Sequence, residues 1–208
     1  MFAVVSRWSA ILGALLFIFM VVAIGVMTPD YNPIGQFVSE LGAVDAPFSA
    51  VMNFVGIVPF GSAIILFALG FFTRAHFGHL TVLGGALLAL SGAGLVAAGF
   101  SPCDVGCPFE GSRTQLIHNW TAFSAFILAF FSAIWIGVSA LWGAKRVFPL
   151  LAGIVAAAAM GISFNLMGAG GLDHPMIGLY QRAFLLALCL WLIAIGAYSV
   201  STAAKRGT

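Results

Sequence analysis

The sequence predicts an all-α polytopic membrane protein, a bundle of six transmembrane helices that forms a single domain over residues 1–208. Two observations carry this prediction. Hydrophobic residues make up 62% of the chain and charged residues only 7%, against about 25% in an average soluble domain. The apolar stretches are also helix-length, whereas strands of an outer-membrane barrel alternate over about 10 residues. Soluble enzymes, nucleic-acid-binding proteins, coiled coils and disordered linkers are therefore excluded.

Six apolar stretches approach or exceed the roughly 20 residues that cross about 30 Å of hydrocarbon. The connections between them are short, so we expect one compact domain without a linker. The first stretch is longer than a typical signal-peptide core and lacks a clear cleavage site before Thr28, so we expect it to stay as a span. The predicted spans are Ser9–Met27, Phe48–Phe72, His79–Gly99, Thr114–Trp142, Val147–Gly168 and Met176–Thr202.

The basic residues predict the orientation, because cytoplasmic connections carry an excess of Lys and Arg. With both termini in the cytoplasm, only Arg113 and Arg182 fall outside. The basic residues that then fall inside are Arg7, Arg74, Lys145, Arg146, Lys205 and Arg206. We therefore expect a multi-pass protein of the cytoplasmic (inner) membrane with cytoplasmic termini. All acidic residues fall on the outer side: Asp30, Glu40, Asp45, Asp104, Glu110 and Asp173.

Small residues recur at every fourth position in two spans, which is the spacing that lets helix backbones approach closely in a membrane. They are Gly85, Ala89, Ala93 and Ala97 in the third span, and Gly153, Ala157, Gly161 and Asn165 in the fifth. We expect them to pack within the bundle. Pro59 interrupts the second span, and we expect a kink there because proline has no backbone N–H.

The first outer loop, residues 28–47, has the signals of a short helix. Asn32 suits its N-cap, Pro33 its first position and Gly42 the residue after its end. The apolar residues between them share one helical face: Ile34, Phe37, Val38 and Leu41. We expect a short helix in the outer membrane interface. It either covers the bundle or presents Ser39 and Glu40 to a site.

The second outer loop contains Cys103 and Cys107. An extracytoplasmic environment is oxidising, which favours a disulfide between them. A pair of free thiols and a pair of thiolate metal ligands are the alternatives, and one C-x-x-x-C motif is a weak zinc signal. Cys189 falls within the sixth span, where it is most simply a small buried hydrophobic residue.

Polar side chains near the outer ends of the spans form a candidate site. His118 and Arg182 each lie about one helical turn inside a span, where an ionisable residue is costly and indicates function. Arg182 needs a carboxylate or a phosphate, which suit the guanidinium group. The other members of the set are Ser39, Glu40, Asp104, Asn119, Asp173 and His174.

Several chemistries fit this set. Asp104 and His118 could bind a divalent metal, or Glu40, Asp104 and His118 could perform acid–base catalysis. Arg113, Arg182 and His118 could instead bind an anionic headgroup. The structural alternative is that these side chains cap helices and loops. Haem between His118 and His174 is disfavoured, since nothing brings the two residues together and a C-x-x-C-H motif is absent.

These residues resemble domain-of-unknown-function family 998, a group of six-span bacterial and archaeal membrane proteins within the wider Frag-like group. The resemblance covers nearly the whole chain, and Ser39-Glu40-Leu41-Gly42 is its most specific part. The remaining matches are the rest of the run Tyr31–Gly42, Asp104, His118-Asn119 and Gly178–Arg182. The resemblance implies a six-span fold and a polar pattern at Ser39, Glu40, Asp104, His118 and Arg182, but no reaction.

Three functions fit the sequence. The first is an enzyme that hydrolyses or remodels a lipid or a lipid-linked headgroup, such as a phospholipid of the outer leaflet. The second is a non-catalytic binder or transporter of an anionic headgroup or a cation. The third is an accessory subunit of a larger membrane complex. In each case we expect the lipid bilayer as a partner and no nucleic acid.

Overall fold

The computed structural model describes residues 2–72, 79–141, 147–171 and 174–204. Within these ranges the chain consists of helices and their connections, without a strand. Six helical segments are long and apolar enough to cross a membrane: Val4–Met27, Ser49–Gly70, Leu80–Phe100, Arg113–Ser139, Val147–Gly170 and Ile177–Thr202. The protein is thus an all-α polytopic membrane protein, as its sequence predicts.

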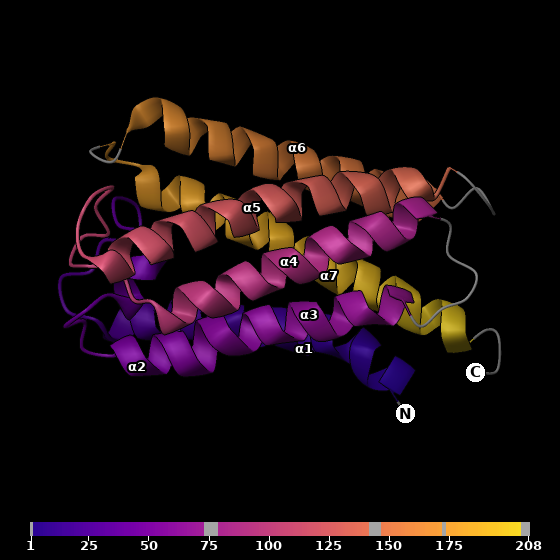
Figure 1. The fold of residues 1–208 in the computed structure, drawn as a ribbon, viewed down its shortest axis with the longest axis horizontal. Coiled ribbons are helices and arrows are strands. Elements are labelled where there is room, and N and C mark those ends of the chain that lie inside the picture. The colour runs from indigo at the N-terminus through magenta and orange to yellow at the C-terminus, as the bar shows by residue number, and fades with distance from the viewer. Residues whose placement is uncertain (1, 73–78, 142–146, 172–173, 205–208) are drawn as a thin grey trace.

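The helices pack mainly against their neighbours in the chain, and the last helix returns to the first (Figure 1). The two chain ends lie at the same end of the bundle (Figure 1). The long helices are α1 (Phe2–Met27), α3 (Val58–Phe72), α4 (His79–Phe100), α5 (Arg113–Ser139), α6 (Val147–Gly170) and α7 (Ile177–Ala204). Two short segments, α2 (Ser49–Val51) and η2 (Met52–Ile57), precede α3 and belong to the second span.

The second span departs from α-helical geometry just before Pro59. The segment η2, Met52–Ile57, is a π helix. Pro59 cannot donate the i→i−4 hydrogen bond that an α helix would place on the carbonyl of Val55. A π segment is one of the few ways in which a helix accommodates such a loss. The sequence predicts a kink at Pro59, and the structure has a change of helix type directly before this residue.

Helix backbones approach closely at glycines. A Cβ on Gly92 of α4 would lie 2.6 Å from the carbonyl oxygen of Gly61 in α3, and a Cβ on Gly61 would lie equally close to the carbonyl oxygen of Gly92. Gly153 of α6 meets α5 at Gly137. Gly153 belongs to a predicted small-residue row. In the other predicted row Gly85 is buried but Ala93 is exposed, and Gly92, which meets α3, lies outside that row.

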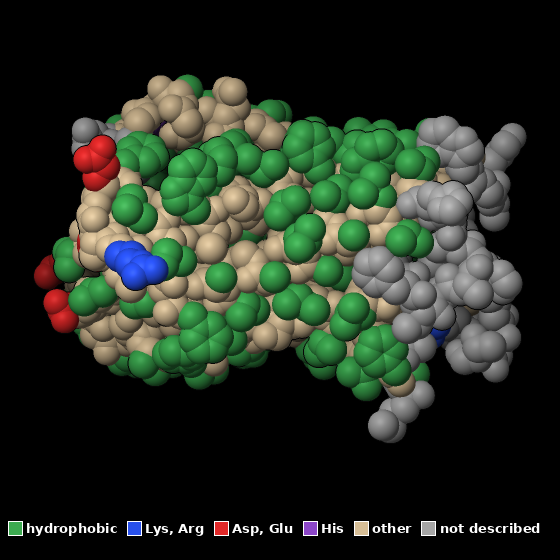
Figure 2. Space-filling model, in the orientation of Figure 1, with side chains coloured by type: hydrophobic (Ala, Val, Ile, Leu, Met, Phe, Trp, Pro, Cys, Tyr) green, Lys and Arg blue, Asp and Glu red, His purple; other side chains and the backbone are tan. Residues whose placement is uncertain are grey.

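The side of the bundle is largely apolar, and the acids gather at one end (Figure 2). This end lies opposite the chain termini and carries the first loop, residues 28–48, and the second loop, residues 101–112. We call it the acidic end, after Asp30, Glu40, Asp45, Asp104 and Glu110 in these loops. Asp173 lies outside the described residues, as do Arg74, Lys145, Arg146, Lys205 and Arg206.

Candidate functional site

The first loop contains a shorter helix than the sequence predicts. The 3-10 helix η1 covers only Val38–Gly42. Phe37 before it is extended, with φ −63° and ψ 152°, and this conformation interrupts the helix expected from Pro33. Val38 and Leu41 are buried, so η1 packs into the bundle.

A separate turn precedes η1 and explains the interruption. The Asn32 side-chain oxygen accepts a hydrogen bond from the backbone N–H of Ile34 at 3.0 Å. The Gln36 side-chain oxygen accepts one from the backbone N–H of Asn32 at 2.6 Å. Asn is favoured in such turns because its side chain bonds the backbone two residues on. Asn32 therefore organises a turn and not the start of a long helix.

Glu40 fixes the start of η1. Its carboxylate accepts hydrogen bonds from the backbone N–H of Phe37 at 2.8 Å and from Gln36 Nε2 at 2.9 Å. At the end of η1, Asn53 Nδ2 donates to the carbonyl oxygen of Gly42 at 2.8 Å. A Cβ on Gly42 would collide with the Asn53 amide. Glu40 therefore shapes this loop, and Gly42 holds it on the second span.

Arg182 fastens the first loop to the start of α7. Its Nη1 donates to the carbonyl oxygens of Gln36 at 2.8 Å and Gly178 at 3.0 Å, and its Nη2 donates to the hydroxyl of Tyr31. The Tyr31 hydroxyl donates in turn to the carbonyl oxygen of Phe37 at 2.7 Å. The sequence predicts a carboxylate or phosphate partner for Arg182. The structure supplies two backbone carbonyls and a phenol instead.

The start of α7 also contacts this loop through its backbone and through Gln181. The Leu179 N–H donates to the carbonyl oxygen of Ile34 at 2.9 Å. Gln181 Oε1 accepts from the backbone N–H of Val38 at 2.5 Å. A Cβ on Gly178 would overlap the backbone of Gln36, so only glycine permits this approach.

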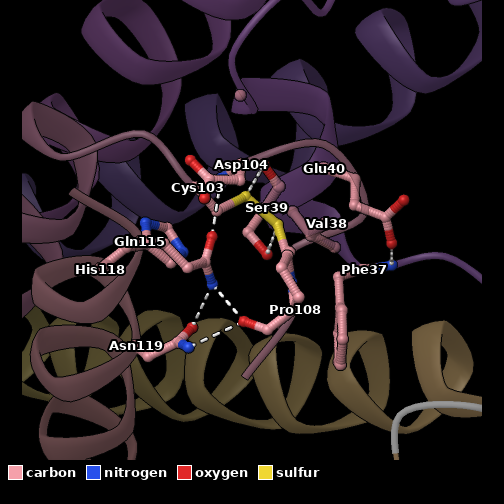
Figure 3. Close-up of a disulfide and its surroundings, with 12 residues drawn as sticks. Phe37, Val38, Ser39, Glu40, Cys103, Asp104, Pro108, Gln115, His118 and Asn119 are labelled. Carbon is pink, nitrogen blue, oxygen red and sulfur yellow. Dashed lines mark hydrogen bonds between the residues drawn. A yellow bond between two sulfur atoms is a disulfide. The ribbon is translucent and has the colours of Figure 1, made fainter. Parts of the chain in front are cut away.

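Cys103 and Cys107 form a disulfide, with their Cα atoms 5.1 Å apart, which confirms the first of the three predicted alternatives. Both cysteines are buried, with 0% and 6% of their surface exposed. Ser39 of the first loop lies against the bond, its Oγ 3.4 Å from Cys107 Sγ and its carbonyl oxygen 3.6 Å from Cys103 Sγ (Figure 3). Ser39 therefore contacts the disulfide and joins the two loops.

Asp104 organises the second loop and the start of α5. Its carboxylate accepts hydrogen bonds from the backbone N–H and the hydroxyl of Ser112, each at 2.7 Å. These bonds favour the ionised form and lower the pKa of the carboxyl below its usual value. Ser112 itself caps α5, because its Oγ accepts from the backbone N–H of Gln115 at 3.1 Å.

Asn119 and Gln115 hold the other side of the second loop (Figure 3). Asn119 Nδ2 and Gln115 Nε2 donate to the carbonyl oxygen of Pro108, at 2.9 Å and 2.5 Å. Gln115 Nε2 also lies 2.9 Å from Asn119 Oδ1, and Gln115 Oε1 accepts from the backbone N–H of Asp104 at 2.6 Å. Gln115 is fully buried and is a central polar residue that the sequence analysis did not single out.

His118 is buried, with 6% of its surface exposed, and bonds to the end of α4. Its Nδ1 lies 2.9 Å from the carbonyl oxygen of Ser101 and 3.2 Å from that of Ala98. Carbonyl oxygens only accept hydrogen bonds, so Nδ1 carries a proton. His118 therefore ties α5 to α4.

His174 belongs to a different group, at the start of α7. Its Nδ1 accepts a hydrogen bond from the backbone N–H of Met176 at 3.1 Å, and its ring centroid lies 5.2 Å from that of Tyr180. Its predicted neighbour Asp173 lies outside the described residues.

The three predicted catalytic side chains have separate sets of hydrogen-bond partners. Figure 3 shows the Glu40 carboxylate directed toward the backbone of Phe37 and away from His118. Asp104 bonds to Ser112, and His118 bonds to carbonyl oxygens of α4 and the second loop. Across the described ranges, no group of three or more His, Cys, Asp or Glu side chains could hold a metal ion.

A pocket opens at the acidic end between the two loops, with a volume of about 280 Å³. Its acidic lining residues are Asp30, Glu40 and Asp45. In the described part of the chain, no residue donates a hydrogen bond to the carboxylates of Asp30 and Asp45. The other lining residues are Thr28, Pro29, Tyr31, Gln36, Ala43, Val44, Ala46, Val105 and Gly106.

Comparison with known proteins shows the family. The model of the protein family of unknown function DUF998 matches residues 11–198. The chain belongs to the DUF998 family. No curated protein and no solved structure matched the chain.

In this DUF998 protein the residues that carry the family resemblance hold the acidic end together. Glu40 and Gly42 shape the first loop, Asp104 the second, and Arg182 joins the first loop to α7. The pocket's other two acids, Asp30 and Asp45, were not among the predicted site residues. Both have left-handed backbone conformations, with φ 57° and 65°, which Asp tolerates in turns. The placement of all acidic residues on the outer side, which the sequence predicts, was the signal that could have identified them.

Proposed function

We propose that this DUF998 protein lies in the cytoplasmic membrane with its acidic end outward and binds a small organic cation there without changing it chemically. One observation carries the proposal. Three carboxylates line the pocket, and no Lys or Arg is among its lining residues. Clustered charges of one sign attract a ligand of the opposite sign, most strongly in a recess with walls of low dielectric constant.

The lining favours an organic cation over a bare ion. The pocket volume of about 280 Å³ exceeds the space that a single ion needs, and Val44 and Val105 give it apolar surface. A ligand with an ammonium group and a short apolar stem would satisfy both parts. Asp30 and Asp45 are the better candidates for direct contact, because the Glu40 carboxylate already accepts two hydrogen bonds.

The contacts at the acidic end give less support to an anionic ligand or to lipid hydrolysis. The guanidinium of Arg182 already donates to Gln36, Gly178 and Tyr31. A phosphate would have to displace these bonds, which hold the first loop. The residues predicted to hydrolyse a headgroup, Glu40, Asp104 and His118, also have separate partners in the loops and helices.

The test uses three four-carbon probes that differ in charge: putrescine (doubly positive), 1,4-butanediol (neutral) and succinate (doubly negative). The purified protein in zwitterionic nanodiscs is heated with each probe at constant ionic strength. A ligand that binds only the folded state raises the melting temperature. We expect putrescine alone to raise it and to be recovered intact. Stabilisation by succinate but not by putrescine would contradict the proposal.

Variants place the effect in the pocket. We expect the double variant Asp30→Asn, Asp45→Asn to bind putrescine at least about tenfold more weakly, a change of about 1.4 kcal/mol. Glu110→Gln is the matched control, because Glu110 is exposed in the second loop and is not a lining residue. An equal loss in both variants would indicate a general effect of net charge and would rule out this pocket.

A further inference from the structure

The disulfide lies at the junction of the two pocket walls. Val105 and Gly106, which line the pocket from the second loop, are two of the three residues between Cys103 and Cys107. The facing wall, residues 43–46 of the first loop, follows directly on η1. The bond therefore closes one wall covalently and lies next to the other.

The first loop rests on the disulfide through both polar and apolar contacts. The Val44 N–H donates to the carbonyl oxygen of Cys103 at 2.8 Å. Ala43 is buried in a small cluster with the two cysteines, and Phe37 and Ala46 pack against it. This cluster is separate from the main core of the bundle. Residues 43–46 thus pack on the disulfide, and the carbonyl oxygen of Ala46 also accepts a hydrogen bond from the N–H of Ser49, the first residue of the second span, at 3.0 Å.

The backbone between the cysteines has a tight turn that the bond closes. The Cys107 N–H donates to the carbonyl oxygen of Asp104 at 2.9 Å. Gly106 has φ 78°, and Cys107 has φ 45°, a left-handed conformation that costs a residue other than glycine free energy. A covalent ring that contains both residues limits the other conformations available to the open chain.

We propose that the Cys103–Cys107 disulfide positions the pocket: it fixes the Val105–Gly106 wall and provides the surface on which residues 43–46 fold. The nature of the ligand, an organic cation, rests on the proposed function, whereas the contact between the first loop and the disulfide does not.

The structure contains an internal reference for testing this role. Residues 34–38 of the same loop are held by α7, through the N–H of Leu179, Gln181 Oε1 and the Arg182 guanidinium. These hydrogen bonds do not involve a cysteine, although the Phe37 ring also packs against the cysteine cluster. Loss of the disulfide should therefore release residues 43–46 and leave residues 34–38 in place.

Hydrogen exchange measured by mass spectrometry tests this contrast in nanodiscs. The protein is compared before and after reduction with dithiothreitol, which transfers two electrons and two protons to the S–S bond and closes to its own cyclic disulfide. We expect exchange in peptides covering 43–46 to become roughly tenfold faster on reduction, while peptides covering 34–38 stay within about twofold. Unchanged exchange at 43–46 would overturn the proposal. So would equal acceleration in both segments, since the bond would then support the whole loop.

The double variant Cys103→Ser, Cys107→Ser tests the same point without a reductant, and Cys189→Ala is its matched control. Cys189 is buried in α7 and is not bonded to another cysteine. We expect putrescine binding to weaken at least about tenfold in the double variant and to persist in the control. Unchanged binding in the double variant would overturn the positioning role. Failure of putrescine to bind the wild-type protein would contradict the proposed function alone, and the exchange contrast would still test the disulfide.

Discussion

The contacts of Arg182 account for a charged side chain at the edge of the apolar bundle. Its guanidinium bonds to the start of α7, to the turn at Gln36 and to the hydroxyl of Tyr31. The guanidinium carbon, Cζ, lies 5.3 Å from the centre of the Tyr31 ring. A planar group with several fixed donors can bond all three acceptors, whereas an ammonium group is a single point of charge.

We therefore expect Arg182→Lys to destabilise the protein by about 1.5–3 kcal/mol, the usual contribution of hydrogen bonds to a charged group. The loss should appear as a lower midpoint in a chemical unfolding experiment in detergent. Arg113→Lys is the control, because Arg113 is exposed at the start of α5. Equal midpoints for Arg182→Lys and the wild-type protein would show that the fork geometry is dispensable.

Asp104 makes stability depend on pH in the acidic range. The hydrogen bonds from Ser112 lower the pKa of its carboxyl in the folded protein. The folded state thus stabilises the ionised form of Asp104. This stabilisation is fully present above the pKa of the unfolded chain, near 3.8, and it is lost as the pH falls through the lower pKa of the folded protein.

The comparison of Asp104→Asn with the wild-type protein measures this contribution. At neutral pH the variant should melt at a lower temperature than the wild type. The difference in melting temperature should shrink as the pH falls below about 4, because the wild-type carboxyl then becomes protonated and, like the Asn side chain, carries no charge. A difference that is independent of pH would contradict the assignment of the effect to the charge.

Sequence reasoning placed the polar residues at one end of the bundle but could not find their partners. The acceptors for Arg182 and His118 include backbone carbonyls of Gln36, Gly178, Ala98 and Ser101. Every residue has such a carbonyl, so side-chain identity does not indicate which one is near. A carboxylate was expected as the partner of Arg182 because Asp and Glu can be read from the sequence, and a phosphate because its geometry suits a guanidinium group.

The transmembrane helices were the most predictable elements, because their length and apolar composition follow from the thickness of the bilayer. The short helix in the first loop was predictable in existence but not in extent. Its apolar face at Val38 and Leu41 is real. The extended Phe37 is followed at once by the bond from the Val38 N–H to Gln181 of α7, a contact distant in sequence. Gly92, at which α4 meets α3, was also missed, because it lies outside the four-residue spacing of Gly85, Ala89, Ala93 and Ala97 that the sequence shows.

The contact between α3 and α4 yields a prediction for these two elements. Gly92→Ala should destabilise the protein by about 1–3 kcal/mol, since the new Cβ would lie 2.6 Å from the carbonyl oxygen of Gly61 and would separate the helices. Gly168→Ala is the matched control in α6, where a Cβ would meet nothing within 4 Å. Thermal unfolding in the same detergent compares the two. Equal melting temperatures would contradict the close approach.

At the scale of the whole molecule, the charge distribution predicts that the acidic end is extracytoplasmic. Labelling of single introduced cysteines in intact cells tests this orientation. The disulfide and the burial of Cys189 keep the native cysteines from reacting. We expect a membrane-impermeant maleimide to label Glu110→Cys in intact cells, and Thr208→Cys at the C-terminus only after permeabilisation. The reverse pattern would show that the acidic end is cytoplasmic.

The joining of the first loop to α7 also has a consequence for biosynthesis. Residues 31–42 emerge from the ribosome early, but their partners Gly178, Gln181 and Arg182 emerge long after them. The earlier helices can pair with their chain neighbours as they are made, whereas this loop has no α7 to dock on until the last span is inserted. The part of the pocket wall that α7 holds, at Tyr31 and Gln36, is therefore completed at the end of translation, and a chain that stops before its final helix should insert into the membrane without this part of the wall in place.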